Sequence, residues 1–79
     1  MPFVNIRTVK GLLTESQKKE LQDRITDLLV EIEGRGNPRF RQFVWVLIDE
    51  QEPANWSMSG RQLSPELLQA FTRPDAGTA

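Results

Sequence analysis

The sequence predicts an α/β (α+β) fold, a short β-α-β subunit with two parallel strands that assembles into an oligomer. Three observations predict it. In residues 2–8, apolar side chains alternate with side chains of mixed character, as in a strand with one buried face. Residues 14–34 have apolar side chains at the spacing of one helical face, and residues 42–49 form a short apolar run. Because no hairpin fits between these segments, the two strands are expected to be joined by a parallel, right-handed crossover.

The first predicted strand, PFVNIRT, has one apolar face. Val4 and Ile6 alternate with residues of mixed character, which is the period-two pattern of a strand. A Lys-Gly pair at 10–11 ends the run.

The predicted helix has a defined start, face and end. Thr14 and Gln17 are spaced as a capping box. The apolar residues that follow recur on one helical face, namely Leu21, Ile25, Leu28, Leu29 and Ile32. Gly34 and Gly36 are expected to end the helix, and Pro38 opposes its resumption.

The second predicted strand lies in QFVWVLID, which has no polar face and is expected to be buried on both sides. One helix covers only one face of a two-stranded sheet. The other face carries Phe3 together with either the Phe43, Trp45 and Leu47 set or the Val44, Val46 and Ile48 set. Because large exposed apolar patches are rare on monomers, we expect this open face to be a subunit interface.

The 79 residues allow one small domain, which we place at 1–72, with a flexible tail at 73–79. Residues 50–63 are polar and turn-rich, and Ser64-Pro65 predicts the start of a second, short helix. A domain of this size buries only about 60–65% of its unfolded surface, so it needs additional support. Association between subunits is the support that we expect.

The composition excludes several classes of site. Cysteine and histidine are both absent, which removes disulfides, common zinc sites, thiol nucleophiles and imidazole bases. We therefore expect no metal and no cofactor. The net charge of −1 and the acidic end of the second strand argue against a nucleic-acid-binding module. No apolar run approaches the roughly 20 residues of a membrane span, and no signal peptide is apparent, so a cytoplasmic location is expected.

Pro2 is the candidate catalytic residue. If Met1 is removed, as is usual before a small residue, the ring nitrogen of Pro2 becomes a free secondary amine. An α-amino group has a pKa near about 8, and apolar surroundings or a nearby positive charge lower that pKa. A neutral amine can accept a proton and return it elsewhere. The alternative is that Pro2 has no catalytic role, since many proteins have proline at position 2 only because it suits removal of the initiator Met and an extended N-terminal backbone.

The order of the segments points to a known family. Over about residues 2–64 the chain resembles the 4-oxalocrotonate tautomerase branch of the tautomerase superfamily. The resemblance lies in the order of five segments: Met-Pro-apolar-Val-Asn-Ile, a Lys-Gly turn, the helix TESQKKEL, the strand VWVLIDE and then NWSMSGRQLS. The resemblance implies β-α-β subunits that assemble as homo-oligomers, generally hexamers, with a trimer or dimer as alternatives. It also implies that Pro2 is the general base and acid in keto-enol proton transfer on a 2-oxo acid or a related enol, without a cofactor.

The resemblance also implies one residue of the pocket wall, and it shows two positions at which this sequence differs from the best-known family members. Trp56 matches the aromatic residue that makes the family's pocket apolar, although packing at a subunit interface also explains it. In the best-known members an arginine follows the glycine of the first turn, where Leu12 follows Gly11 here. A second family arginine matches Trp45, which we include among the expected substrate contacts. The two changes imply an altered substrate, such as a monoacid, or a low native rate.

Other cations are candidates to replace these arginines. Arg39 and Arg41 precede the second strand and would point the same way in an extended chain, forming a carboxylate clamp. Arg7, Lys10 and Arg61 are further candidates. Each of the five is alternatively a solvated surface charge or part of a salt bridge between subunits.

Two alternative functions stay open. A promiscuous hydratase or dehalogenase would use a carboxylate to position water, but Met58 occupies the place that such relatives use, and Glu50 and Glu52 are close but out of position. The other alternative is a non-catalytic oligomeric module that keeps only the fold.

Overall fold

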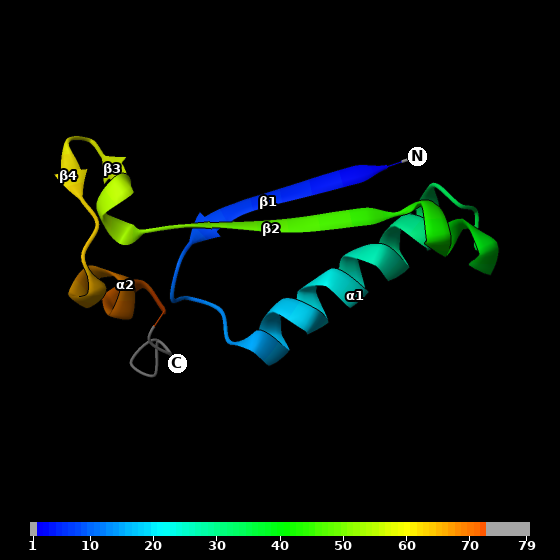
Figure 1. Ribbon diagram of the computed structural model, residues 1–79, viewed down its shortest axis with the longest axis horizontal. Coiled ribbons are helices and arrows are strands. Elements are labelled where there is room, and N and C mark those ends of the chain that lie inside the picture. Colours follow the sequence, from blue (N-terminus) through cyan, green and yellow to red (C-terminus); the bar gives the residue numbers. More distant parts are fainter. Residues whose placement is uncertain (1, 73–79) are drawn as a thin grey trace, which may run out of the picture.

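The computed structural model describes residues 2–72. Its elements are β1 (Phe3–Val9), α1 (Glu15–Ile32), the 3-10 helix η1 (Pro38–Phe43), β2 (Trp45–Gln51), η2 (Pro53–Asn55), β3 (Ser57–Met58), β4 (Arg61–Gln62) and α2 (Pro65–Thr72). β1 and β2 pair in parallel, with Phe3 opposite Trp45 and Val9 opposite Gln51. Figure 1 shows α1 along one face of this sheet, and no other described element covers the opposite face. The predicted β-α-β unit with parallel strands is therefore confirmed.

The start of α1 is the predicted capping box. The Thr14 hydroxyl accepts from the Gln17 backbone N–H at 3.1 Å, and the Gln17 side chain accepts from the Thr14 N–H at 2.9 Å. These two bonds satisfy donors that a helix start leaves unpaired. The end of α1 also follows the sequence. Gly36 has a φ of +80°, and a Cβ on Gly34 would lie 2.7 Å from the Phe40 side chain.

The second strand differs from its prediction in two ways. It begins at Trp45 rather than at residue 42, because Asn37 caps η1 through the Arg39 N–H and this 3-10 helix continues to Phe43. It is also not buried on both faces. From Trp45 to Ile48 its residues alternate between an exposed face and the half-buried face under α1, because a single helix covers only one side of the sheet, whereas residues 49–51 are all half-buried.

The segment after β2 folds into a small hairpin that the sequence did not predict. β3 and β4 pair antiparallel, and Ser59 and Gly60 between them have φ values of +53° and +81°. Two consecutive positive φ angles are typical of a tight hairpin turn. The second helix starts as predicted, since the Ser64 hydroxyl accepts from the Leu67 N–H at 3.2 Å.

Very little of the described chain is buried. The buried apolar residues are Val9, Leu63 and Leu68, where the C-terminal elements pack on the end of β1. Eight large apolar side chains are exposed, namely Phe3, Leu28, Ile32, Phe43, Trp45, Leu47, Met58 and Phe71. No helix among residues 2–72 is long and apolar enough to cross a membrane. The tail predicted at 73–79 lies outside the described residues.

Candidate active site

An apolar hollow of about 230 Å³ lies at the end of the sheet where both strands begin, lined by Pro2, Phe3, Phe43 and Trp45. Pro2 is half-buried, and its carbonyl accepts from the Trp45 backbone N–H at 3.1 Å. This bond continues the parallel ladder by one residue and fixes Pro2 against β2. Carbon surfaces of this kind disfavour a charged group, so an amine placed here is biased toward its neutral form.

The two positions at which the family resemblance implies an arginine hold apolar side chains, Trp45 and Leu12. Trp45 lies directly opposite Phe3 on the open face of the sheet and is 63% exposed. Leu12 packs against the buried cluster around Val9. Trp45 therefore lines the hollow beside Pro2, and Leu12 packs on the buried cluster at the other end of β1.

Arg39 and Arg41 do not form the expected clamp. Both lie in η1, where a 3-10 helix with three residues per turn places residues two apart on different sides. Arg41 also bonds Asp27 of α1, with 2.5 Å between Nη1 and Oδ1. The expectation that the two side chains point the same way is wrong, because the chain before β2 is helical rather than extended.

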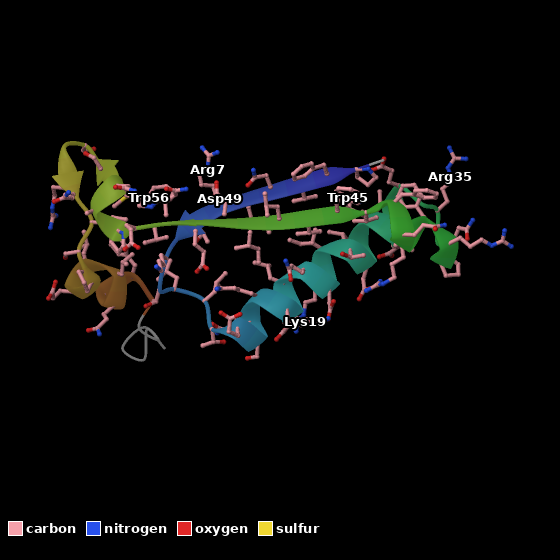
Figure 2. The ribbon with its side chains drawn as sticks, viewed as in Figure 1. Arg7, Lys19, Arg35, Trp45, Asp49 and Trp56 are labelled. Carbon is pink, nitrogen blue, oxygen red and sulfur yellow. The ribbon has the colours of Figure 1, made fainter. Side chains whose placement is uncertain are left out.

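A second, more polar hollow lies at the other end of the sheet, with a volume of about 440 Å³ and a lining of Arg7, Gln51, Asn55 and Trp56. Arg7 and Asp49 are cross-strand neighbours whose side chains point away from α1 (Figure 2), with 3.3 Å between Nε and Oδ2. The Trp56 indole N–H donates to the Gln51 carbonyl at 3.4 Å. Sequence reasoning singled out Arg7 and Trp56 separately, but it missed Gln51 and Asn55, the last residues of β2 and η2, because neither belongs to a recognisable sequence pattern.

The two hollows are far apart within one subunit. Pro2 precedes the first residue of β1, whereas Trp56 follows the last residue of β2, and Figure 2 shows Trp45 and Trp56 toward opposite ends of the sheet. A seven-residue strand spans about 20 Å at its usual rise. The side chains of Pro2 and Trp56 therefore do not meet within a single chain.

The acidic residues near the end of β2 are held in ion pairs. Glu50 bonds Lys18 at 2.6 Å between Oε1 and Nζ, and Glu52 bonds Lys10 at 3.1 Å. The hydrogen bond from Lys18 to Glu50, and next that to Glu15, raise the pKa of Lys18 above its ordinary value of 10.5. In the described part of the chain no three acidic, histidine or cysteine residues are grouped as metal ligands.

The parallel β-α-β subunit is the fold of solved members and homologues of the 4-oxalocrotonate tautomerase family. The family model described as tautomerase enzyme matches residues 2–65. The chain belongs to the tautomerase family, as the resemblance in its sequence indicated.

Individual relatives agree with this membership. The chain is 43% identical over 70 residues to the probable tautomerase K2 of Dickeya dadantii (strain 3937), covering 89% of this chain and 98% of the relative. It is similar to the crystal structure of DmpI from Helicobacter pylori, with 32% identity, a TM-score of 0.62, and coverage of 77% of this chain and 94% of that one. It is also similar to YwhB, a homologue of 4-oxalocrotonate tautomerase, with 25% identity, a TM-score of 0.66, and coverage of 81% and 97%.

Proposed function

We propose that this chain is a cofactor-independent tautomerase that works in the cytoplasm on a 2-oxo acid or a related enol. Pro2, freed by removal of Met1, is its general base and acid. The observation that carries the proposal is the position of Pro2 in an apolar hollow, anchored to Trp45. Family membership supports the isomerase class, and the family match begins at residue 2.

The proposed reaction is a balanced proton transfer. The neutral nitrogen of Pro2 takes the proton of the enol hydroxyl, and the resulting prolinium returns a proton to the carbon at the far end of the double bond. The double bond moves from carbon-carbon to carbon-oxygen, and the enzyme ends in its starting protonation state. The apolar walls favour the neutral amine at the start of the cycle.

We further propose that the working site is shared between copies of the chain. One end of the subunit supplies Pro2, and the other supplies an indole wall, Trp56, and a cation, Arg7. Because these groups lie on opposite ends of the sheet, they can face one another only across a contact between subunits. The exposed apolar side chains on the open face supply a surface for that contact. A homo-oligomer follows, and six copies is the number that the family resemblance implies.

Arg7 is the cation that we favour for the substrate carboxylate. It lines the same hollow as Trp56, and its ion pair with Asp49 uses Nε, which leaves the two terminal nitrogens to form a forked pair with a carboxylate. Arg39 is the second candidate, because η1 leads directly into the start of β2 near Pro2. Arg41 is the weaker choice because Asp27 already binds it.

The ion pairs of the acidic residues argue against the hydratase or dehalogenase alternative. Glu50 and Glu52 are each bonded to a lysine, and Met58 lies exposed on β3. A carboxylate committed to a nearby ammonium is a poor base for activating water. Proton transfer by Pro2 therefore remains the chemistry that the described residues support best.

The test starts from the untagged chain with its mature N-terminus identified by mass spectrometry. Ketonisation of a simple enol is then measured for this protein, for Pro2→Ala, and for a variant that keeps one extra residue before Pro2. We expect both variants to lose at least about 100-fold in kcat/KM, in line with the usual contribution of a general base. An exposed substitution, Gln69→Ala, serves as the matched control. Full activity with a blocked Pro2 would overturn the proposal, and an inactive chain with a free Pro2 would favour the non-catalytic module.

A further inference from the structure

Asp49 is an acidic residue to which the proposed reaction gives no role, and it lies directly opposite Arg7 in the sheet. Its carboxylate is bonded on both sides. Oδ2 accepts from Nε of Arg7 at 3.3 Å, and Oδ1 accepts from the side-chain amide of Gln51 at 3.0 Å. All three residues belong to one chain, so a single subunit already holds this arrangement before any neighbouring copy is added.

Gln51 connects this ion pair to the indole wall of the proposed site. Its side chain donates to Asp49, and its backbone carbonyl accepts from the Trp56 indole N–H at 3.4 Å and from the Lys10 backbone N–H at 2.7 Å. Figure 2 shows Arg7, Asp49 and Trp56 toward the same end of the sheet. The cation and the aromatic wall are therefore held by one continuous set of hydrogen bonds at the end of β2.

The ion pair contributes orientation rather than folding stability. The side chains of Arg7 and Asp49 are 66% and 31% exposed, and ion pairs in contact with water add little to stability. A bond to Nε, however, fixes the plane of a guanidinium and leaves both terminal nitrogens free for a forked pair with another carboxylate. Binding that carboxylate then costs less of the rotamer freedom that a long side chain otherwise loses.

The negative charge of Asp49 opposes this effect, because it repels a substrate carboxylate. That repulsion is weakened by the positive charge of Arg7 between the two carboxylates and by the water that reaches the pair. Orientation is therefore the larger effect, and the two make opposite predictions for the loss of Asp49.

We propose that Asp49 is a positioning residue that aims the terminal nitrogens of Arg7 at the substrate carboxylate, and that Gln51 holds Asp49 in place. This role rests on the proposed function, which assigns Arg7 to that carboxylate, and adds the residues that set the direction of the guanidinium. Because Asp49 acts through Arg7, it matters for ligands that carry a carboxylate and not for uncharged ones.

NMR titrations of crotonate, a planar unsaturated monoacid, and of its uncharged amide, crotonamide, into the untagged protein test this role. We expect Asp49→Ala to weaken binding of crotonate by about 10-fold, the order of one hydrogen bond to a charged group, and to leave crotonamide unchanged. Asp49→Asn keeps an oxygen that accepts from Arg7 and should restore most of the lost affinity. Equal weakening of both ligands, or unchanged or tighter binding of crotonate by Asp49→Ala, would overturn the inference.

Arg7→Gln separates this inference from the proposed function. If Arg7→Gln leaves the affinity for crotonate unchanged, the proposed role of Arg7 fails and that of Asp49 falls with it. If Arg7→Gln weakens crotonate and Asp49→Ala does not, only the role of Asp49 fails. In the ketonisation assay with an enol that carries a carboxylate, Asp49→Ala should raise KM and leave kcat near its native value.

Asp23→Ala is the matched control, because Asp23 also bonds a surface cation, Lys19, at 2.9 Å but lies on α1. It should leave both affinities unchanged. Because Asp49 lies near the open face, the mass of each variant is checked by sedimentation. Gln51→Leu, which frees the Asp49 side chain without removing its charge, replaces Asp49→Ala if that variant dissociates, with the same selective loss of crotonate binding expected.

Discussion

Replacing Leu47 with aspartate tests the role of the open sheet face. Leu47 keeps 49% of its exposure in the subunit, so association can bury about half of a leucine side chain, worth about 1 kcal/mol per copy. Aspartate loses that contribution and adds the cost of bringing a charge against the apolar face, about 2 kcal/mol or more. We therefore expect Leu47→Asp to weaken each contact by about 3 kcal/mol, which is about 100-fold in the dissociation constant.

Sedimentation velocity over a dilution series measures this shift directly. Ala70→Asp is the matched control, because it adds the same charge at an exposed position of α2. The control should keep the mass and the dilution behaviour of the native protein. If Leu47→Asp also keeps them, the open face is not the interface, and the reasoning from exposed apolar side chains is refuted.

Three predictions concern the subunit itself. Gly34→Ala should lower the free energy of unfolding by about 1–3 kcal/mol in urea titrations, since its Cβ would lie 2.7 Å from Phe40; an unchanged midpoint would show that Phe40 moves freely. Thr14→Ala should cost about 1 kcal/mol by removing the capping box of α1, and a change below about 0.3 kcal/mol would contradict the cap. Because Glu50 raises the pKa of Lys18, the stabilisation by this pair is present below pH 10.5 and disappears as pH rises through the folded-state pKa. The difference in unfolding free energy between the native and Lys18→Met proteins should therefore stay constant up to pH 10.5 and shrink as the pH is raised further, and a difference that persists unchanged above pH 10.5 would refute this.

The parts of the fold that the sequence predicted are those set by local chemistry. The capping box at Thr14, the serine cap of α2 and the glycines after α1 act within a few residues of themselves. The parallel pairing of β1 and β2 followed from the order strand, helix, strand, because the helix fills the connection and no hairpin joins the two strands. Such features are readable without knowing what the chain packs against.

The features that were missed depend on contacts between distant segments or on weak local signals. The 3-10 helix η1 includes Arg39 and Arg41 and ends at Phe43, whose ring contacts that of Phe40. The apolar run had instead predicted an extended chain over residues 42–44. The β3–β4 hairpin has strands of two residues, too short to show alternation.

The candidate site was predictable only in part, for the same physical reason. Pro2 and Trp56 stood out as residue types, and Arg7 as a charge on a mixed strand face. That Arg7 and Trp56 share one hollow, at the end of the sheet away from Pro2, depends on how η2 turns the chain after β2. No residue pattern encodes that turn, and in the proposed site the completing groups come from another copy of the chain.

Nitrogen-15 NMR of Pro2 tests the central claim most directly. Of the 5 prolines in the sequence, only a processed Pro2 would carry a titrating ring nitrogen, so proline labelling gives one responsive signal. We predict a midpoint near pH 7 or lower, below the value of about 8 for an ordinary α-amino group. A midpoint at about 8 or above, or a Pro2 nitrogen still in an amide bond to Met1, would contradict the account.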